Sequence, residues 1–257
     1  MSILDTPAPM WAMVKNSVNR TLAPLGLQVR RSERFFELGR IPLPPGRDPF
    51  RDMARNLSHR PNPVFFDVGA NEGTTIRAIR QQFAYPQIHA FEPNPRTFDV
   101  LKQNMSRFEG VHLNNFGLGS YSGEADFYEV DQSWMCSFLK PDQMGWGNLE
   151  KIHKLPLKTL DDYCKMNCIE RIDVLKTDTQ GFDLEVLKGA RRMLEEKRIG
   201  MAYMEIIFSK MYEGIPRLDE TLKFLMDFGF SIGAIYTVYY ENEIASWTDI
   251  LFIQKSK

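Results

Sequence analysis

The sequence lacks the features of a membrane-spanning or disulfide-stabilised protein. Its 257 residues contain no run of about eighteen or more apolar residues, so no transmembrane helix is predicted. The first residues show no basic start followed by an apolar core and a small-residue cleavage site, and we therefore expect a cytoplasmic protein. The three cysteines, Cys136, Cys164 and Cys168, form no CxxC pair, which argues against both a disulfide framework and a zinc site.

The composition is that of a folded domain with a basic amino-terminal segment. Hydrophobic residues make up 43% and charged residues 25% of the chain, which gives no reason to expect disorder. Residues 1–60 contain ten Lys or Arg against five acids, a bias that fits either a solvated basic face or contact with an anionic partner. Helical spacing in Met10–Leu25 and the proline-rich run Ile41–Gly46 predict a helix and a linker. We therefore divide the chain into an extension, 1–60, and a catalytic domain, 61–257.

From Pro63 onward, short β-rich runs alternate with helical stretches. This order is typical of an α/β sheet that is mostly parallel and covered by helices on both faces. The last two strands have no helix between them, so we expect them to pair antiparallel, with 241–246 as the turn. Helices are expected after the first, second, fourth and fifth of the seven predicted strands, which are 64–68, 87–92, 111–116, 172–177, 201–206, 231–239 and 248–254.

A long insertion, about 118–160, separates the third and fourth predicted strands. It contains two strand-like runs, 124–130 and 155–160, around a middle that is rich in Trp, Met and Gly. Long loops in compact domains often serve as covers for a binding site. Residues 131–154 are therefore predicted to form a lid over the substrate.

The run from Val64 to Gly73, VFFDVGANEG, has the pattern of a nucleotide-binding turn. A buried strand leads into a glycine turn, and a helix is expected to begin at Thr74. Gly69 permits a positive φ and a close backbone approach, while Gly73 allows the helix to pack near the sheet. Glu92 follows Gly73 by nineteen residues and could accept both ribose hydroxyls of an adenosine.

The same loop favours S-adenosylmethionine over a dinucleotide. Asn71 stands nearest to the place where a dinucleotide fold has its middle glycine, and its side chain obstructs a pyrophosphate. S-adenosylmethionine carries an ammonium and a carboxylate instead of phosphates. Asp67 could face the ammonium, and amides at the helix start could face the carboxylate.

Four blocks in this order resemble the FkbM-type methyltransferase family: FDVGANEG at 66–73, FEPNP at 91–95, GLGSYSGE at 117–124 and LKTDTQGFDLEVLKGA at 175–190. The similarity runs from about Val64 to Ile253. It implies a Rossmann-like, seven-stranded class I methyltransferase sheet and O-methylation of a sugar, glycan or polyketide hydroxyl. The cofactor residues it implies, together with neighbours in or beside these blocks, are Asp67, Gly69, Ala70, Asn71, Gly73, Thr74, Glu92, Pro93, Asn115 and Asp178.

Asp178 is the first candidate for the acid–base role. A carboxylate at the carboxyl end of the fourth predicted strand would lie beside the transferred methyl and could deprotonate a hydroxyl, or it could simply cap the next helix. Glu205, Asp249 and the insertion's His153 are further candidates. The family often has Glu where this chain has Gln180, so a scheme with two carboxylates at this turn is in doubt. Mg²⁺ could bind among the three acids, but no spacing requires it, and no metal site is predicted.

Several readings of the function remain open at this stage. The first is O-methylation of a sugar or glycan hydroxyl, with Trp134, Trp146, Tyr239, Tyr240 and Trp247 available to stack on the acceptor. A small secondary metabolite is an alternative acceptor. A nicotinamide-dependent oxidoreductase and a non-catalytic glycan- or nucleic-acid-binding module are further alternatives. Nucleic acid is not an expected substrate, because TDTQ occupies 177–180 where base-modifying relatives often carry an aromatic–proline tetrad.

We predict that hydrogen exchange in 131–154 slows when cofactor and acceptor bind together, because lids become ordered over their ligands. Exchange measured by mass spectrometry, with and without both ligands, tests this expectation. Unchanged exchange in this segment would contradict the lid.

Overall fold

The computed structural model describes residues 27–31, 36–40, 44–143, 145 and 147–254. The chain divides into two units, 1–44 and 45–257. In the first unit, β1 (Leu27–Arg31) and β2 (Phe36–Arg40) form an antiparallel hairpin. The helix predicted over Met10–Leu25 and the stacking candidate Trp146 lie outside the described residues.

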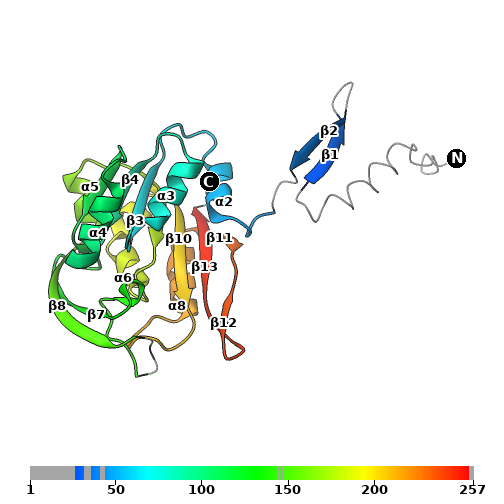
Figure 1. The fold of residues 1–257 in the computed structure, drawn as a ribbon. Coiled ribbons are helices and arrows are strands. Elements are labelled where there is room, and N and C mark those ends of the chain that lie inside the picture. The colour runs from blue at the N-terminus through cyan, green and yellow to red at the C-terminus, as the bar shows by residue number, and fades with distance from the viewer. Residues whose placement is uncertain (1–26, 32–35, 41–43, 144, 146, 255–257) are drawn as a thin grey trace. The chain divides into compact units, whose positions relative to one another are not determined.

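The second unit alternates strands and helices in the predicted manner (Figure 1). Its elements in chain order are α2 (Pro49–Asn56), β3 (Val64–Val68), α3 (Thr74–Gln82), β4 (Gln87–Phe91), α4 (Pro95–Met105), β5 (Val111–Asn114), β6 (Gly117–Leu118), β7 (Gly123–Val130), the short 3₁₀ helix η2 (Ser133–Met135), β8 (Leu149–Lys158), α5 (Leu160–Met166), β9 (Ile172–Thr177), α6 (Asp183–Lys188), α7 (Arg191–Glu195), β10 (Ile199–Ile207), α8 (Leu218–Asp227), β11 (Phe230–Ile235), β12 (Tyr239–Glu241) and β13 (Ile244–Gln254).

The main sheet has the strand order β5-β4-β3-β9-β10-β13-β11, and β12 pairs with β13. From β5 to β10 in this order, each strand is parallel to the next one. Strand β13 is antiparallel to both of its neighbours, β10 and β11. The predicted Rossmann-like α/β sheet with an antiparallel last strand is therefore confirmed. The strand order reverses between β3 and β9, and in such sheets ligands bind beyond the carboxyl ends of the strands at the reversal.

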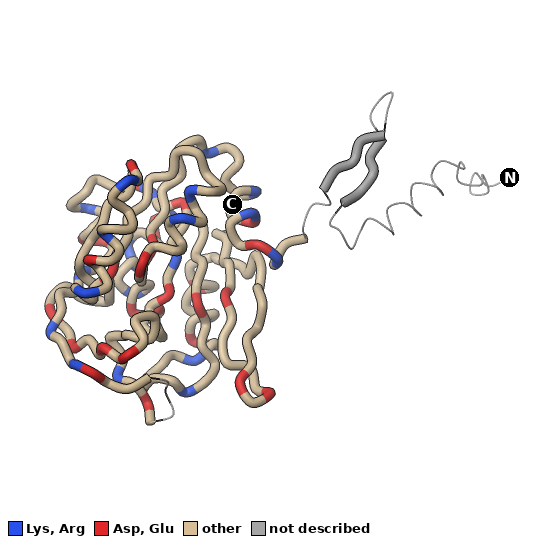
Figure 2. The backbone as a smooth tube through the Cα atoms, in the orientation of Figure 1, with Lys and Arg blue, Asp and Glu red and all other residues tan. Residues whose placement is uncertain are grey.

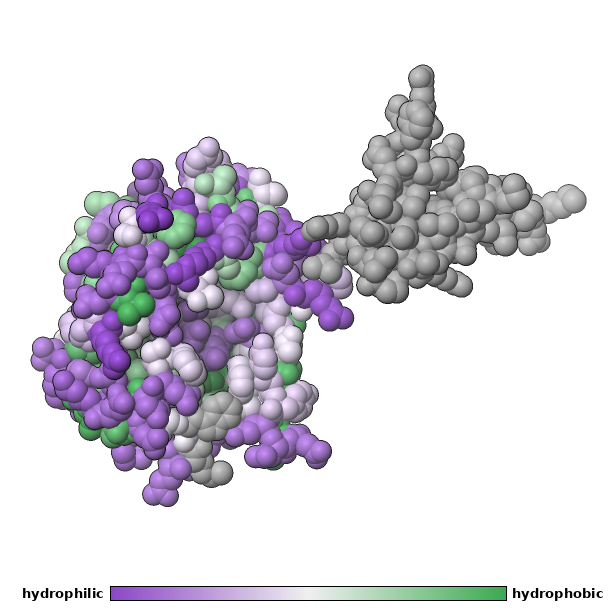
Figure 3. Space-filling model, viewed as in Figure 1, coloured by the Kyte–Doolittle hydropathy of each residue, from purple (hydrophilic) through white to green (hydrophobic). Residues whose placement is uncertain are grey.

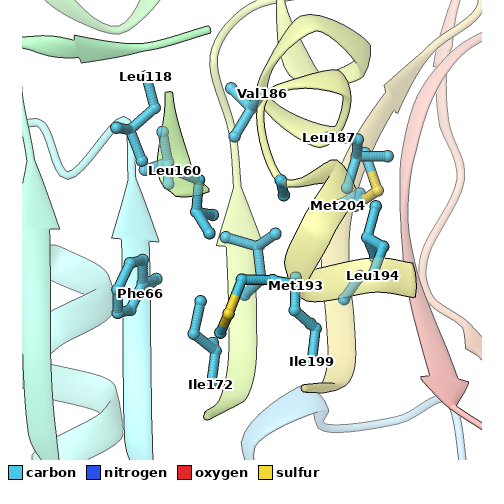
Figure 4. Close-up of a cluster of buried hydrophobic side chains, with 14 of the residues drawn as sticks. Phe66, Leu118, Leu160, Ile172, Val186, Leu187, Met193, Leu194, Ile199 and Met204 are labelled. Carbon is cyan, nitrogen blue, oxygen red and sulfur yellow. The ribbon is translucent and has the colours of Figure 1, made fainter. Parts of the chain in front are cut away.

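Helices cover both faces of the sheet because neighbouring residues of each strand point to opposite sides. In β3, Phe65 belongs to a core cluster with Met53, Ile76 and Leu101, which lie on α2, α3 and α4. Phe66 belongs to the opposite cluster, formed with residues of α5 to α8. Figure 4 shows part of this second cluster between the sheet and its helices.

The single helix predicted after the fourth strand is two helices in the structure, α6 and α7, which share the apolar stripe of Leu184, Leu187 and Leu194. The break falls at Gly189, where an added Cβ would lie 2.0 Å from the carbonyl oxygen of Gly119. Asp161 then caps the new helix, because its carboxylate accepts from the amides of Arg192 (2.7 Å) and Met193 (3.1 Å). A distant side chain therefore creates a helix start that local periodicity does not reveal.

The closing strands also differ in detail from the prediction. The strand expected over 231–239 ends at Ile235, and β12 is a separate strand. Asn242 and Glu243 have φ values of 47° and 65°, as expected for a tight two-residue hairpin turn. The turn is therefore shorter than the predicted 241–246. Gly229, with φ 86°, follows the C-cap Phe228 of α8 and ends this helix at the C′ position.

The insertion forms a sheet of its own, with order β6-β8-β7. Strand β8 begins at Leu149, six residues before the predicted strand, because its first half is largely exposed and lacks an apolar signal. The predicted lid, 131–154, thus contains part of a strand as well as a loop. Ser137 fastens that loop to the core, with its Oγ 2.9 Å from the carbonyl oxygen of Gln180.

The surface of the second unit carries no dominant charge. Figure 2 shows basic and acidic positions interspersed along its chain, and the face in Figure 3 is mainly hydrophilic, with hydrophobic residues in small groups. Among the helices that the structure describes, none has the length and apolar character needed to cross a membrane.

Replacing Gly69 with Ala tests the packing between the first turn and β9. An added Cβ would lie 1.9 Å from the carbonyl oxygen of Asp178, and φ is 78°. We expect Gly69→Ala to lower the free energy of unfolding by more than about 3 kcal/mol, measured by urea denaturation.

Gly214→Ala is the matched control for this change. Its φ is 72°, but nothing lies within 4 Å of the added Cβ, so only backbone strain of about 1–2 kcal/mol is expected. Equal losses in the two variants would contradict the packing argument.

Candidate active site

A cavity of about 290 Å³ opens beyond the carboxyl ends of β3, β4, β9 and β10. Its walls come from segments that are distant in the sequence: the glycine turn after β3, the end of β4, the insertion, the turn after β9, the end of β10 and the residues after it, and β13. The lining residues include Gly69, Asn71, Glu92, Pro93, Trp134, Ser137, Phe138, Asp178, Gln180, Glu205, Met211 and Trp247. The site therefore lies at the strand-order reversal, where the fold leads one to expect it.

Glu92 is held rigidly at the edge of this cavity. The amide of Asn71 donates to its Oε2 (3.0 Å), and the amide of Asn94 donates to its Oε1 (2.9 Å). Burial raises the pKa of Glu92 to about 7, although the two amide bonds oppose the shift. Each carboxylate oxygen has a second lone pair for a ligand hydroxyl. This geometry fits the predicted ribose contact.

Asn71 provides a second feature that fits a polar ligand. It has a φ of 45° and lines the cavity. Its side-chain Oδ1 is buried and has no hydrogen-bond partner in the described structure. A buried acceptor without a donor is costly, so a donor on a bound ligand would stabilise this site.

Asp67 contacts a lysine that the sequence reasoning missed. Lys176 Nζ lies 2.9 Å from Asp67 Oδ1 and 3.6 Å from Asp178 Oδ2, and it donates to the carbonyl oxygen of Gly69 (2.9 Å). Burial raises the pKa of Asp67, and the charge of Lys176 opposes that shift. Asp67 is fully buried, and it lines neither this cavity nor a neighbouring cavity of about 250 Å³ that is described below. Its contact with the cofactor ammonium stays a prediction, and the structure places it beneath the loop.

Lys176 could have been found from the sequence by its setting. It lies in β9, a central parallel strand in which every residue is buried. Charged residues are almost never fully buried unless they are paired. A lysine inside a predicted central strand therefore signals a buried acidic partner, which is Asp67 on the neighbouring strand.

The remaining predicted cofactor residues divide into lining and supporting residues. Pro93 lines the cavity, whereas Ala70 is buried beneath the turn. Gly73 packs against α4, because an added Cβ would lie 2.7 Å from Met105. Asn115 donates from Nδ2 to the carbonyl oxygens of Glu92 (2.9 Å) and Pro93 (3.1 Å), and so it fixes the end of β4 without lining the cavity.

A second cavity, of about 250 Å³, adjoins the first at Asp178. Thr74 and Thr75 line it at the start of α3, where the helix dipole favours a negative group. Tyr203 and Asp249 line the opposite wall. The helix predicted to begin at Thr74 does so, and this cavity could receive the methionine end of the cofactor.

Asp178 and Glu205, two of the predicted catalytic residues, are brought together by Gln180. Gln180 Nε2 lies 3.2 Å from Asp178 Oδ1 and 2.9 Å from Glu205 Oε2. Burial, followed by the charge of Asp178, raises the pKa of Glu205 well above its ordinary value. The Asp178 side chain is 43% exposed, so its carboxylate is accessible from the cavity. Gln180 thus links an accessible acid on the turn after β9 to a half-buried acid on β10.

The other two catalytic candidates lie elsewhere. Asp249 accepts from the hydroxyl of Tyr203 (2.8 Å) in the second cavity. His153 Nε2 lies 2.7 Å from Glu129 Oε2 and does not line the main cavity. Within the described part of the chain, no group of three or more His, Cys, Asp or Glu is arranged to hold a metal ion.

The titration of Glu92 yields a prediction for ligand affinity. Ribose hydroxyls donate to the ionised carboxylate, whose pKa is about 7 without ligand. Affinity for S-adenosylhomocysteine should therefore be constant at higher pH and fall as pH drops below about 7, by up to about tenfold per unit. Calorimetry between pH 5.5 and 8.5 measures this dependence.

Glu92→Gln is the matched variant for this titration. It should bind roughly 10- to 100-fold more weakly at pH 8, because it loses charge-assisted hydrogen bonds. It should also lose the decline below pH 7. A wild-type affinity that does not change with pH would contradict the assignment.

Comparisons with known proteins identify the family of this chain and several relatives. The family model described as the methyltransferase FkbM domain matches residues 67–232. The 2-O-methyltransferase NoeI of Sinorhizobium fredii is 27% identical over 184 residues, which cover 67% of this chain and 75% of NoeI. The hexuronic acid methyltransferase AglP of Haloferax volcanii is 30% identical over 164 residues, which cover 62% of this chain and 59% of AglP.

Among solved structures, TrmK of M. capricolum in complex with S-adenosylhomocysteine is 11% identical with a TM-score of 0.44, covering 80% of this chain and 67% of TrmK. The family match spans the glycine turn, Glu92, Asp178 and Glu205, the residues that shape the cavity. The chain therefore belongs to the FkbM methyltransferase family and is an S-adenosylmethionine-dependent methyltransferase.

Proposed function

We propose that the enzyme transfers the methyl group to a hydroxyl of a sugar or glycan. The observation that carries this proposal is the accessible Asp178 carboxylate, joined through Gln180 to Glu205 in the cavity that also contains Glu92. The names of two relatives, a 2-O-methyltransferase and a hexuronic acid methyltransferase, support the same class of acceptor.

Asp178 is suited to bind the acceptor hydroxyl and take its proton. The bound cofactor supplies a methyl group that is already activated by its sulfonium, so the protein has to align the acceptor oxygen and remove a proton. Gln180 Nε2 and Lys176 Nζ fix the two oxygens of Asp178 from different sides. A hydroxyl group that enters the cavity can therefore meet a carboxylate of defined orientation.

Glu205 is suited to a different task. Its raised pKa, caused by burial and neighbouring acids, means that Glu205 holds a proton more readily than an ordinary glutamate does. A protonated carboxyl can donate a hydrogen bond, whereas a carboxylate can only accept. Two acids in unequal environments can therefore share the proton that the acceptor hydroxyl gives up.

Aromatic side chains at the cavity are compatible with a sugar ring, whose C–H faces are apolar. Trp134 lines the cavity and is 61% exposed. Trp247 lines it as well, and Tyr239 stacks on Trp247 with 4.8 Å between ring centroids. Large amphipathic rings of this kind bind partly apolar ligands with little loss of conformational entropy.

Isotope-labelled S-adenosylmethionine tests the proposed acceptor class. The purified protein is incubated with the labelled donor and either a panel of hexoses, hexuronic acids and oligosaccharides or a cell extract. We expect the label in an O-methyl sugar after hydrolysis, detected by mass spectrometry. Label found only in non-carbohydrate products would contradict the proposal.

Asp178→Asn tests the role of this carboxylate. Asn keeps the shape but cannot take a proton, so kcat should fall about 10²- to 10⁴-fold. Affinity for S-adenosylhomocysteine should change much less. Asp227→Asn is the matched control, because Asp227 is an exposed acid on α8 that pairs with Lys223. A folded Asp178→Asn protein with normal turnover would remove Asp178 from the mechanism.

A further inference from the structure

Gln180 lies between the two acids of the cavity and a buried tyrosine. Its Nε2 faces Asp178 and Glu205, and its Oε1 is 3.0 Å from the hydroxyl of Tyr212. The backbone of Gln180 has φ 55°, a conformation that is uncommon for residues other than glycine. Ser137 Oγ holds the carbonyl of this residue. The amide is therefore kept within reach of all three groups.

The hydrogen bonds around Tyr212 cannot all form at once. Its hydroxyl lies 2.9 Å from the carbonyl oxygen of Met135 and 3.0 Å from Gln180 Oε1. Both oxygens can only accept, and a tyrosine hydroxyl has one hydrogen. One acceptor is therefore left without a donor in this arrangement. A half-turn of the amide exchanges its oxygen and nitrogen and gives a second arrangement.

The second arrangement satisfies the Tyr212 hydroxyl, the Met135 carbonyl and the Gln180 amide oxygen if one acid is protonated. Gln180 Nε2 then donates to the hydroxyl oxygen of Tyr212, and the Tyr212 hydroxyl donates to Met135. Gln180 Oε1 faces Asp178 and Glu205 and has to receive a hydrogen from one of them. The first arrangement thus suits an ionised Asp178–Glu205 pair, and the second suits a pair that holds one proton.

We propose that Gln180 is a positioning residue that alternates between these two arrangements. The Asp178–Glu205 pair thereby releases a proton when the cationic methyl donor binds, and it regains a proton from the acceptor hydroxyl. In the transfer, the S–C bond breaks and its electron pair cancels the charge on sulfur. The O–C bond forms, and the hydroxyl proton moves to the pair. This last step rests on the proposed function. The charge of the site is the same before and after transfer.

The surroundings favour a proton on the pair when no ligand is bound. Glu205 is half-buried, and the charged groups that act on it come from three elements: Lys176 and Asp178 at the end of β9, Asp183 at the start of α6, and Asp249 on β13. The acids raise the pKa of Glu205 and the lysine opposes them. Since acids outnumber lysine here, a cation that enters the cavity favours loss of the proton.

Calorimetry in two buffers of different ionisation enthalpy counts the protons released on binding. S-adenosylmethionine and S-adenosylhomocysteine are compared between pH 5.5 and 8.5. Glu92 contributes equally with both ligands, so the difference between them reports the Asp178–Glu205 pair. We expect S-adenosylmethionine to release more protons than S-adenosylhomocysteine does. The difference should reach about half a proton or more at its midpoint, the pH at which it is largest. Equal release by both ligands at every pH overturns the inference.

Two variants should move the midpoint pH of this difference in opposite directions. Gln180→Met removes both N–H donors from the ionised pair, so the midpoint should rise by about one unit. Tyr212→Phe removes two hydrogen bonds from the second arrangement and one from the first, so the midpoint should fall. A shift of both variants in the same direction, or of neither, overturns the inference.

Tyr163→Phe is the matched control for Tyr212→Phe. The Tyr163 hydroxyl also has buried partners, His89 Nδ1 (2.8 Å) and Asn114 Nδ2 (3.2 Å), but it does not line the cavity. The midpoint pH measured for the Tyr163→Phe variant should equal that of the wild type. If Gln180→Met does not fold, the direction of the Tyr212→Phe shift decides. Because no acceptor is used, failure to methylate any sugar would contradict the proposed function alone.

Discussion

The ion pair between Lys176 and Asp67 is the contact on which the rest of the site depends. Two adjacent parallel strands each place a charged residue in the buried interior, directly opposite one another. Removing one partner would leave an uncompensated buried charge, a cost of about 3–5 kcal/mol. Because Lys176 also holds the carbonyl of Gly69 and faces Asp178, the same ammonium fixes both the glycine turn after β3 and the proposed base.

This arrangement links the glycine turn after β3, where we propose that the cofactor binds, to the proposed acceptor site at Asp178. Gly69 packs so closely against Asp178 that no Cβ fits between them. The turn after β3 and the turn after β9 therefore have to move as one body. Lining residues of the two turns face one cavity, which lets a ligand on the cofactor turn be aligned with a hydroxyl group at Asp178.

The insertion completes the cavity and is itself fastened to the core. Ser137 holds the carbonyl of Gln180, and Tyr212 reaches the carbonyl of Met135. These bonds connect the wall of the cavity to the amide that separates the two acids. Proton placement between Asp178 and Glu205 is thus coupled to a wall contact, and the chemistry of the site does not depend on a single side chain.

The sequence by itself determined the α/β class, the glycine turn, the start of α3 and the place of Glu92, because each follows from local periodicity or from a short motif. It also identified Asp178 and Glu205 as separate candidates. Only the tertiary structure decided that Gln180 joins them, that Lys176 pairs with Asp67, and that His153 and Asp249 lie outside the main cavity. The α6–α7 break likewise depends on Asp161, about thirty residues earlier in the chain. These contacts join segments that are far apart in sequence, and no local pattern encodes which side chains will meet when the strands assemble into a sheet.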